Sequence, residues 1–410
     1  MPDIAVIGAG ITGITTAYAL LMRGHSVTVI DQNRYPAMDT SFANGGQLSA
    51  SNAEVWNSWA TILKGLRWML RPDAPLLLNP RPGLHKYGWL MEFCANIRGY
   101  RANTIETTRL AIAARRHLFS IAEREGIDFD LLQKGILHIY HDRASFEQAE
   151  RSNALLREGG LDRYAVTPQE MKAIEPTLHG DYHGGFFTPS DATGDIHKFT
   201  KGLALACERH GARFRFGSVV ETIRPTGKGV TLSLSGGPAA GEERIDVAAV
   251  VICAGSGSRR LAAMLGDRVN IYPVKGYSIT VHLDDEASQA SAPEVSLLDE
   301  DAKIVTSRLG AGRFRVAGTA EFNGMNRDIR ADRIQPLVRW TERLFPGVST
   351  SRVVPWTGLR PMMPDMMPRV APGRQQRVFY NTGHGHLGWT LSAATADLAA
   401  DMVHGAVGAN

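Results

Sequence analysis

The chain opens on a strand, glycine loop and helix that few folds accommodate. Residues 5 to 14 read AVIGAGITGI, so an apolar stretch runs directly into Gly8, Gly10 and Gly13, and Asp31 follows. The predicted elements are a buried strand over 4–7, a helix over 14–22 and a second strand over 26–30. Glycines at this spacing indicate little alone, but after a strand and before a helix they are typical of a dinucleotide-binding βαβ unit.

The glycines and the acid have separate tasks in such a unit. Gly8 permits the tight turn, Gly10 lets the backbone approach a pyrophosphate at the helix N-terminus, and Gly13 lets the helix pack on the strand. Asp31 is placed to accept hydrogen bonds from a ribose diol, and an acid there disfavours the extra phosphate of NADP. Three neighbours are also expected beside the nucleotide: Ile11, Thr12 and Gln32.

The stretch after the second strand favours FAD over NAD. Residues 40–49 read TSFANGGQLS. These small residues, an amide and a glycine pair stand where an extended FAD would carry its isoalloxazine ring past the first domain. A glycine pair permits close backbone approach to a flat ring. The residues expected to contact FAD here are Ser41, Asn44, Gly45, Gly46, Gln47 and Leu48.

Five separated motifs extend this interpretation to nearly the whole chain. In order they read VIGAGITGITTAYAL, TSFANGGQLS, PVKGYSITV, WTGLRPMMPD and NTGHGHLGWT. With these motifs the sequence resembles the D-amino acid oxidase and glycine oxidase superfamily, and within it most closely the bacterial D-amino acid dehydrogenase small-subunit family. The resemblance implies FAD as cofactor, a D-amino acid or D-imino acid as substrate, and a quinone or another respiratory-chain acceptor.

One arginine carries the substrate hypothesis. Arg360 lies in WTGLRPMMPD, a segment too irregular to be helical, and a guanidinium suits a bidentate grip on a carboxylate. The resemblance implies that Arg360 holds the substrate carboxylate over the flavin, and that Tyr277 caps the other carboxylate oxygen or lines the pocket. It also implies that the backbone of Val220 lies beside adenine. Plainer alternatives stay open: a salt bridge within the turn for Arg360, and inward packing on a strand for Tyr277.

Two further segments are expected to close the FAD site. An apolar stretch over 247–255 predicts one strand that ends in Ala254 and Gly255. Near the C-terminus a glycine-rich loop precedes a helix from Trp389, so amides there can stabilise negative charge at the flavin pyrimidine edge. The loop residues expected at this edge are Gly383, Gly385, His386, Leu387 and Gly388. A plain loop histidine is the alternative for His386.

The remaining pattern predicts an α/β protein, α+β overall. A Rossmann-like FAD-binding domain is expected beside a substrate domain built on a mostly antiparallel sheet. The predicted FAD-binding domain covers 1–55, 190–265 and 355–410, and the substrate domain covers 56–189 and 266–354. Further predicted elements are helices over 101–125 and 145–158, and strands over 135–140, 272–283, 302–309 and 313–322. The sequence LGAGRF predicts a hairpin, not a second nucleotide loop, so no NAD(P) site is expected beside the flavin.

Composition limits the classes of partner, the metal or disulfide sites and the cellular location that are expected. The net charge is +4, from 45 Lys and Arg against 41 Asp and Glu without long basic stretches, which argues against a nucleic-acid partner. The cysteines Cys94, Cys207 and Cys253 are unclustered, so neither a disulfide framework nor a metal site is expected. The N-terminus has no basic leader and no apolar stretch reaches membrane-spanning length, so a cytoplasmic location is expected.

The stretch from Trp56 to Trp89 mixes tryptophans with lysines, arginines and prolines. Two interpretations stay open. The stretch forms helices and a loop that cover the FAD domain, or it presents a basic aromatic surface to lipid headgroups or a quinone pool. The second interpretation implies peripheral contact with the inner membrane.

Together these parts predict oxidative deamination of D-amino acids to 2-oxo acids and ammonia. Hydride passes from the substrate Cα to flavin N5, so the protein supplies position and electrostatics. The sequence shows no Ser/His/Asp or paired-carboxylate constellation, and this route needs none. The alternatives are a D-hydroxyproline or other secondary-amine dehydrogenase, a flavoprotein subunit of a homo- or hetero-oligomeric amine dehydrogenase complex, and an NAD-binding regulator.

Overall fold

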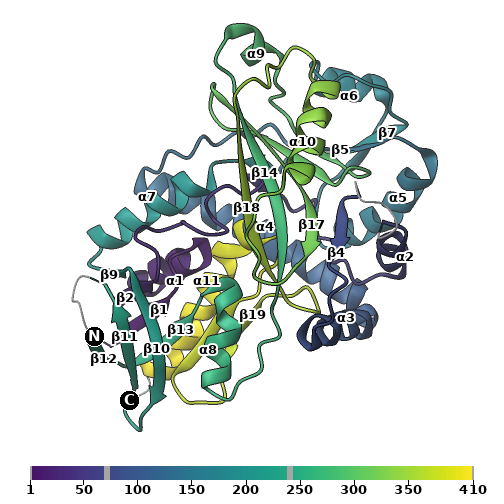
Figure 1. Cartoon of the computed structure of the whole chain (residues 1–410). Helices are drawn as coiled ribbons and strands as arrows, with labels where there is room; N and C mark the ends of the chain where they lie inside the picture. Colours follow the sequence, from purple (N-terminus) through teal and green to yellow (C-terminus); the bar gives the residue numbers. More distant parts are fainter. Residues whose placement is uncertain (1, 69–73, 238–242, 409–410) are drawn as a thin grey trace.

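The computed structural model describes residues 2–68, 74–237 and 243–408. Two large sheets organise the described residues, and a three-stranded and a two-stranded sheet accompany them (Figure 1). Part of the Trp56–Trp89 stretch, residues 69–73, lies outside the described residues. None of the described helices combines the length and apolar character needed to cross a membrane.

The first sheet has six strands in the order β19-β20-β13-β1-β2-β9. Neighbouring strands are parallel except β19 and β20, which are antiparallel. Both faces of this sheet are covered, which is why its inner strands read as continuous apolar stretches. The strands are β1 (Asp3–Ile7), β2 (Ser26–Asp31), β9 (Arg213–Phe216), β13 (Ala249–Ile252), β19 (Arg369–Pro372) and β20 (Val378–Thr382).

Alternate side chains of β1 enter two different cores. Ile4 and Val6 pack with four helices on one face of the sheet, whereas Ala5 and Ile7 pack with three strands and a helix on the other. The helices of the first core are α1 (Ile11–Met22), α4 (Tyr100–Glu125), α7 (Ile196–Arg209) and α11 (Gly388–Val407). The second core is completed by β10 (Ser218–Pro225), β11 (Val230–Gly236), β12 (Glu243–Val247) and α8 (Ser258–Met264).

The second sheet has nine strands, in the order β18-β14-β17-β16-β15-β5-β7-β6, with β4 beside β17. The prediction of a mostly antiparallel substrate-domain sheet is confirmed; only the pairs β15–β5 and β4–β17 are parallel. Its strands are β4 (Leu76–Leu78), β5 (Ile136–Tyr140), β6 (Tyr164–Val166), β7 (Gly184–Thr188), β14 (Tyr272–His282), β15 (Ser296–Asp299), β16 (Ile304–Arg308), β17 (Arg313–Phe322) and β18 (Val353–Met362).

The remaining elements surround the second sheet or join it to the first. The predicted helices over 101–125 and 145–158 are confirmed as α4 and α5, and LGAGRF forms the predicted hairpin between β16 and β17. The helices are α2 (Trp59–Trp68), α3 (Leu84–Ala95), α4 (Tyr100–Glu125), α5 (Arg143–Glu158), α6 (Pro168–Ile174), α9 (Glu286–Ser291) and α10 (Ala331–Leu344). A two-stranded pair, β3 (Gln47–Leu48) with β8 (Ala192–Thr193), lies between the sheets.

The prediction of one strand over 247–255 is wrong. Strand β12 ends at Val247 and pairs with β11, whereas β13 begins at Ala249 and pairs with β1. Both residues are buried, so apolar character alone does not reveal the change of sheet. The segment containing Arg360 is also more regular than its prolines suggest, because β18 pairs with β14 from Val353 to Met362. The arginine therefore reaches the site from the second sheet.

Candidate active site

A cavity of about 870 Å³ lies between the two sheets and is lined by residues from both. It extends from the glycine motif after β1, past residues 40–47, to Arg360 and His386. Of the residues expected to contact FAD, all but Gly13 and Leu48 line this cavity. Gly13 instead faces Gly8, and Leu48 is fully buried in the core beside α11.

The glycine motif fits its expected steric tasks. Gly8 has φ +109°, and a Cβ on Gly8 would lie 2.6 Å from the carbonyl oxygen of Cys253. A Cβ on Gly13 would lie 1.8 Å from the carbonyl oxygen of Gly8, so helix and strand approach too closely for any side chain. Gly10 is open by comparison, and the first turn of α1 has neither a side-chain cap nor an acid. The Ile11 amide donates to Ser41, so the amides available to a phosphate are those that follow it in this turn.

Asp31 stands at the end of β2 with its carboxylate held in place. One oxygen accepts a hydrogen bond from the amide of Ala9 at 2.6 Å, and the other accepts one from the amide of Asn33 at 2.7 Å. Burial raises the pKa of the Asp31 carboxyl. Each ionised oxygen can accept more than one hydrogen bond, so both can also take a ribose hydroxyl.

Residues 40–47 cross from the first sheet to the second. The hydroxyl of Ser41 accepts a hydrogen bond from the amide of Ile11 at 3.0 Å, which ties this segment to the start of α1. At the other end, the hydroxyl of Ser307 donates to the carbonyl of Gly45 at 2.6 Å. A Cβ on Gly45 would lie 2.7 Å from a methyl group of Val305. The glycine pair therefore allows this backbone to lie directly on the second sheet.

Arg360 places a cation inside the cavity. Its Nη1 donates to the carbonyl of Thr319 at 2.8 Å, and its guanidinium covers Gly276, where a Cβ would lie 2.4 Å from Nη2. The ion pairs among the described residues include none with Arg360, and burial lowers its pKa to about 10. The alternative of a salt bridge within the turn has no partner here. A half-buried cation without a counter-ion among the described residues favours an anionic ligand.

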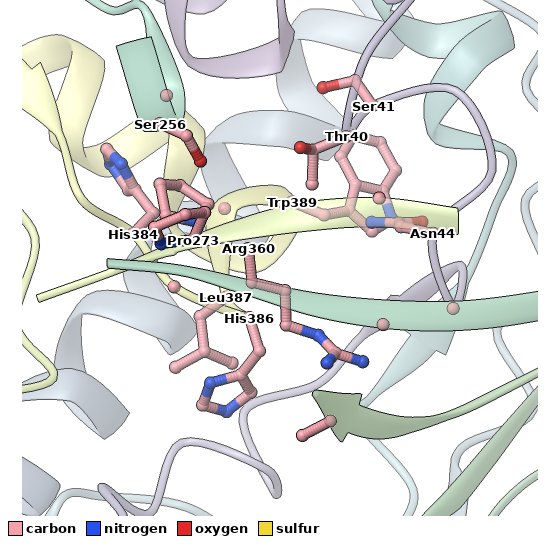
Figure 2. A pocket seen from close by; sticks show the side chains of 18 of the residues that line it. Thr40, Ser41, Asn44, Ser256, Pro273, Arg360, His384, His386, Leu387 and Trp389 are labelled. Carbon is pink, nitrogen blue, oxygen red and sulfur yellow. The ribbon is translucent and has the colours of Figure 1, made fainter. Parts of the chain in front are cut away.

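His386 presents a hydrogen-bond acceptor in the same region. Its ring stacks on Trp56, with centroids 4.6 Å apart, and its Nε2 lies 3.3 Å from the carbonyl oxygen of Asn52. Since a carbonyl only accepts, Nε2 carries the proton, and the buried Nδ1 has no protein partner. Burial lowers the pKa of His386 to about 4. Figure 2 shows this ring and the Arg360 guanidinium on the same side of the strands.

Tyr277 is also among the residues that line the cavity, but its hydroxyl is bonded within the protein. Tyr277 is next to Gly276 on β14, so its side chain leaves the opposite face of the strand from the face that Arg360 covers. Its hydroxyl donates to Glu321 at 2.7 Å, and Lys275 lies 3.4 Å from the same carboxylate. The structure thus brings Arg360 and His386 together, while the Tyr277 hydroxyl packs inward with a buried ion pair.

Sequence reasoning missed a polar extension of the cavity. Ser51, His138 and Glu300 line it and form a Ser/His/acid arrangement, so the statement that no such constellation is present is wrong. The partners are 87 and 162 residues from His138 in the chain, too far apart for any local pattern. The one available signal was a histidine inside the apolar strand GILHIY.

The sequence pattern of the FAD-dependent oxidoreductase family matches residues 3–402. The chain belongs to this family. Curated relatives include D-amino acid dehydrogenase 3 of Mesorhizobium japonicum, 62% identical over 98% of this chain and 97% of the relative. Another is D-amino acid dehydrogenase of Paramagnetospirillum magneticum, 40% identical over 98% of this chain and 95% of the relative.

Solved structures in the same fold include glycine oxidase from Geobacillus kaustophilus, with a TM-score of 0.75 and 22% identity, covering 98% of this chain and 95% of that one. L-proline dehydrogenase from P. horikoshii has a TM-score of 0.76 and 16% identity, covering 98% of this chain and 93% of that one. These likenesses confirm the predicted α/β fold with its mixed second sheet, and family membership makes the chain an oxidoreductase that uses FAD.

The residues of this chain fit FAD. The uncapped first turn of α1 suits a pyrophosphate, and Asp31 suits a ribose. Near the other end of the cavity, the indole N–H of Trp389 is buried without a partner at the start of α11, a helix whose first turn contains no acid. Unpaired donors and a positive helix end suit the electron-rich edge of a flavin. Among the described residues, no group of three His, Cys, Asp or Glu side chains could hold a metal ion.

Proposed function

We propose that the chain is an FAD-dependent D-amino acid dehydrogenase, which oxidatively deaminates D-amino acids to 2-oxo acids and ammonia. The observation that carries the proposal is Arg360, a cation inside the cavity that the expected FAD-contacting residues line, with no acidic partner among the described residues. The relatives named D-amino acid dehydrogenase support the substrate class.

The two site residues would orient the substrate by its two polar groups. Arg360 would hold the carboxylate, because Nε and Nη2 are not used by the described hydrogen bonds of the protein. His386 would accept an N–H of the substrate amine at Nδ1, the unpaired ring nitrogen. FAD, when bound, supplies the acceptor for the hydride that leaves the substrate Cα. Two fixed contacts on one small molecule restrict the directions that its Cα–H bond can take.

An anaerobic screen tests the substrate class. Purified protein with its FAD is mixed with D- and L-enantiomers of alanine, phenylalanine, lysine and proline, and with the hydroxyproline isomers, and loss of flavin absorbance is followed. D-amino acids are expected to bleach the flavin, and their L-enantiomers to leave it oxidised. Bleaching confined to the hydroxyprolines would move the assignment to a cyclic imino acid dehydrogenase. No bleaching by any of these compounds would contradict the proposal.

A surface on α2 and α3 supports a quinone or other non-oxygen acceptor. Large apolar side chains here face solvent, with Leu84 96%, Met91 73% and Trp59 66% exposed. Arg81 and Arg98, which precede and follow α3 in the chain, are also exposed. Residues of α2 also line the cavity, so this acceptor surface adjoins the active site. Apolar and basic side chains together suit a lipid surface, so we propose that a membrane quinone meets the protein here.

Electrons are expected to reach a quinone analogue or dye faster than oxygen. Leu84→Glu should lower turnover with ubiquinone in anionic liposomes by several-fold, because a carboxylate opposes both apolar contact and anionic lipid, while turnover with a soluble dye stays unchanged. Leu205→Glu is the matched control, since Leu205 is an exposed leucine on α7, far from α2 and α3 (Figure 1). Peroxide formation as fast as dye reduction would make the protein an oxidase.

A further inference from the structure

We infer that a chain of four hydrogen-bonded side chains carries the proton of the substrate amine from the active site toward solvent. Its members, here called the relay, are Ser49, Ser51, His138 and Glu300. This inference rests on the proposed function, because it concerns the proton that a D-amino acid must lose before its oxidation.

Contacts within hydrogen-bonding distance join each member of the relay to the next. The Ser49 and Ser51 hydroxyl oxygens are 3.1 Å apart. The Ser51 hydroxyl lies 2.9 Å from His138 Nε2, and His138 Nδ1 lies 3.1 Å from a carboxylate oxygen of Glu300. Ser49, Ser51 and His138 are buried, whereas the side chain of Glu300 is 20% exposed and that of its partner Lys303 is 41% exposed. The relay therefore leads from the interior toward the surface.

The inner end of the relay lies beside the proposed substrate contacts. The amide of Ser49 donates to the hydroxyl of Thr390 in the first turn of α11, at 3.2 Å. Three residues later, the carbonyl of Asn52 accepts the proton of His386 Nε2. The turn from Ser49 to Asn52 therefore contacts the first turn of α11 at one end and the loop before α11 at the other, and both serines of the relay line the cavity.

The charge states allow a proton to pass. Burial lowers the pKa of His138 to about 4, so its ring is neutral near pH 7. Burial alone would raise the pKa of Glu300, but the charge of Lys303 and the hydrogen bond from His138 outweigh this effect and hold the pKa well below its ordinary value. A neutral imidazole between a hydroxyl and a carboxylate accepts at Nε2 and donates at Nδ1. Charged and titratable groups that face the relay are Glu54, Lys64, Tyr140, Arg163, Asp191 and Lys303.

A Ser/His/acid arrangement also suggests a nucleophilic serine, but the backbone around Ser51 excludes this. The amides of Ala50 and Ser51 both donate to the buried carboxylate of Asp191, and the amide of Asn52 donates to Ser49. No amide of this turn is left to stabilise an oxyanion, which acyl transfer requires. Proton transfer needs only the chain of hydrogen bonds.

The proton balance is simple. A substrate ammonium must lose one proton, because only the neutral amine has the lone pair that expels a hydride from Cα. That proton forms an O–H bond at Ser49 as the original Ser49 proton moves to Ser51. The Ser51 proton moves to Nε2 of His138, and the Nδ1 proton moves to Glu300. Glu300 then releases one proton to water, and the hydride carries two electrons from the substrate to FAD, so the relay itself is neither oxidised nor reduced.

His138→Gln tests the relay with little structural change. A glutamine amide can accept from Ser51 and donate to Glu300, so it keeps both hydrogen bonds but cannot pass a proton. Flavin reduction by saturating D-alanine is measured anaerobically in a stopped-flow instrument as pH is raised from 6. At neutral pH the variant should reduce its flavin about 10²-fold more slowly than wild type. The difference in rate between the variant and wild type should disappear as pH rises toward the pKa of the substrate amine, because the substrate then binds as the neutral amine and has no proton to lose.

His141→Gln is the matched control. His141 also pairs with a carboxylate, that of Asp299 at 3.2 Å, and follows β5 directly, but it does not line the cavity. The His141→Gln variant should reduce its flavin at the wild-type rate at every pH. Bleaching of the wild-type flavin by D-alanine establishes the proposed function independently. If His138→Gln then matches wild type at neutral pH, or is slowed by one factor at all pH values, the relay is overturned while the proposed function stands.

Discussion

Arg360→Leu is expected to abolish most activity while the protein keeps its fold and its FAD. A charge-assisted carboxylate pair in a desolvated site contributes about 2–5 kcal/mol, so kcat/KM for a D-amino acid should fall about 30-fold to several thousand-fold. FAD should remain because the glycine motif and residues 40–47 lie on other segments. The measurement is steady-state turnover with a dye, beside the flavin content of the same preparation.

Two comparisons separate carboxylate binding from a structural role of this arginine. Arg360→Lys should restore only part of the activity, since an ammonium lacks the planar fork of a guanidinium. Wild type should strongly prefer an amino acid to the matching amine without a carboxylate, and the leucine variant should lose this preference. Near-normal kcat/KM in the leucine variant would show that the guanidinium only binds the Thr319 carbonyl and does not bind the substrate carboxylate.

The first sheet was predictable because its determinants are local. The turn after β1 requires a glycine at φ +109°, and the next two glycines follow within five residues, so the motif and its consequence share one short segment. The continuous apolar strands then predict a sheet that is covered on both faces. The same apolar character conceals the boundary between β12 and β13, because Val247 and Ala249 on its two sides are both buried.

The candidate site was only partly predictable for the opposite reason. The composition around Arg360 pointed to a carboxylate-binding arginine, but its lack of an acidic partner is a property of the folded cavity. Whether the Tyr277 side chain shares a strand face with Arg360 depends on strand register, since a shift of one residue moves a side chain to the other face. The relay joins segments near residues 50, 138 and 300, and the sequence of any one of these segments does not predict that it contacts the other two.

One buried ion pair holds the backbone on which both the relay and His386 depend. Asp191 is fully buried, pairs with Arg115 of α4, and accepts hydrogen bonds from the amides of Ala50 and Ser51, each at 3.0 Å. It thereby connects α4 to the turn that carries Ser49 and Asn52. The turn is polar and lies inside the protein. Its amides therefore need the Asp191 carboxylate as a hydrogen-bond acceptor, just as the Arg115 guanidinium needs it as a counter-ion.

Asp191→Ala is therefore expected to destabilise the protein strongly. It leaves the Arg115 guanidinium buried without its counter-ion and two amides without acceptors, which together should lower the free energy of unfolding by about 3–5 kcal/mol. Thermal and urea unfolding of the FAD-loaded protein measure this loss. Arg115→Leu combined with Asp191→Leu should be less destabilised than Asp191→Leu alone, because the double variant leaves no unpaired charge and only the two amides remain unsatisfied. A free energy within about 1 kcal/mol of wild type for Asp191→Ala, the range of an exposed ion pair, would show that water replaces the carboxylate and that the turn is held by its contacts with α11 instead.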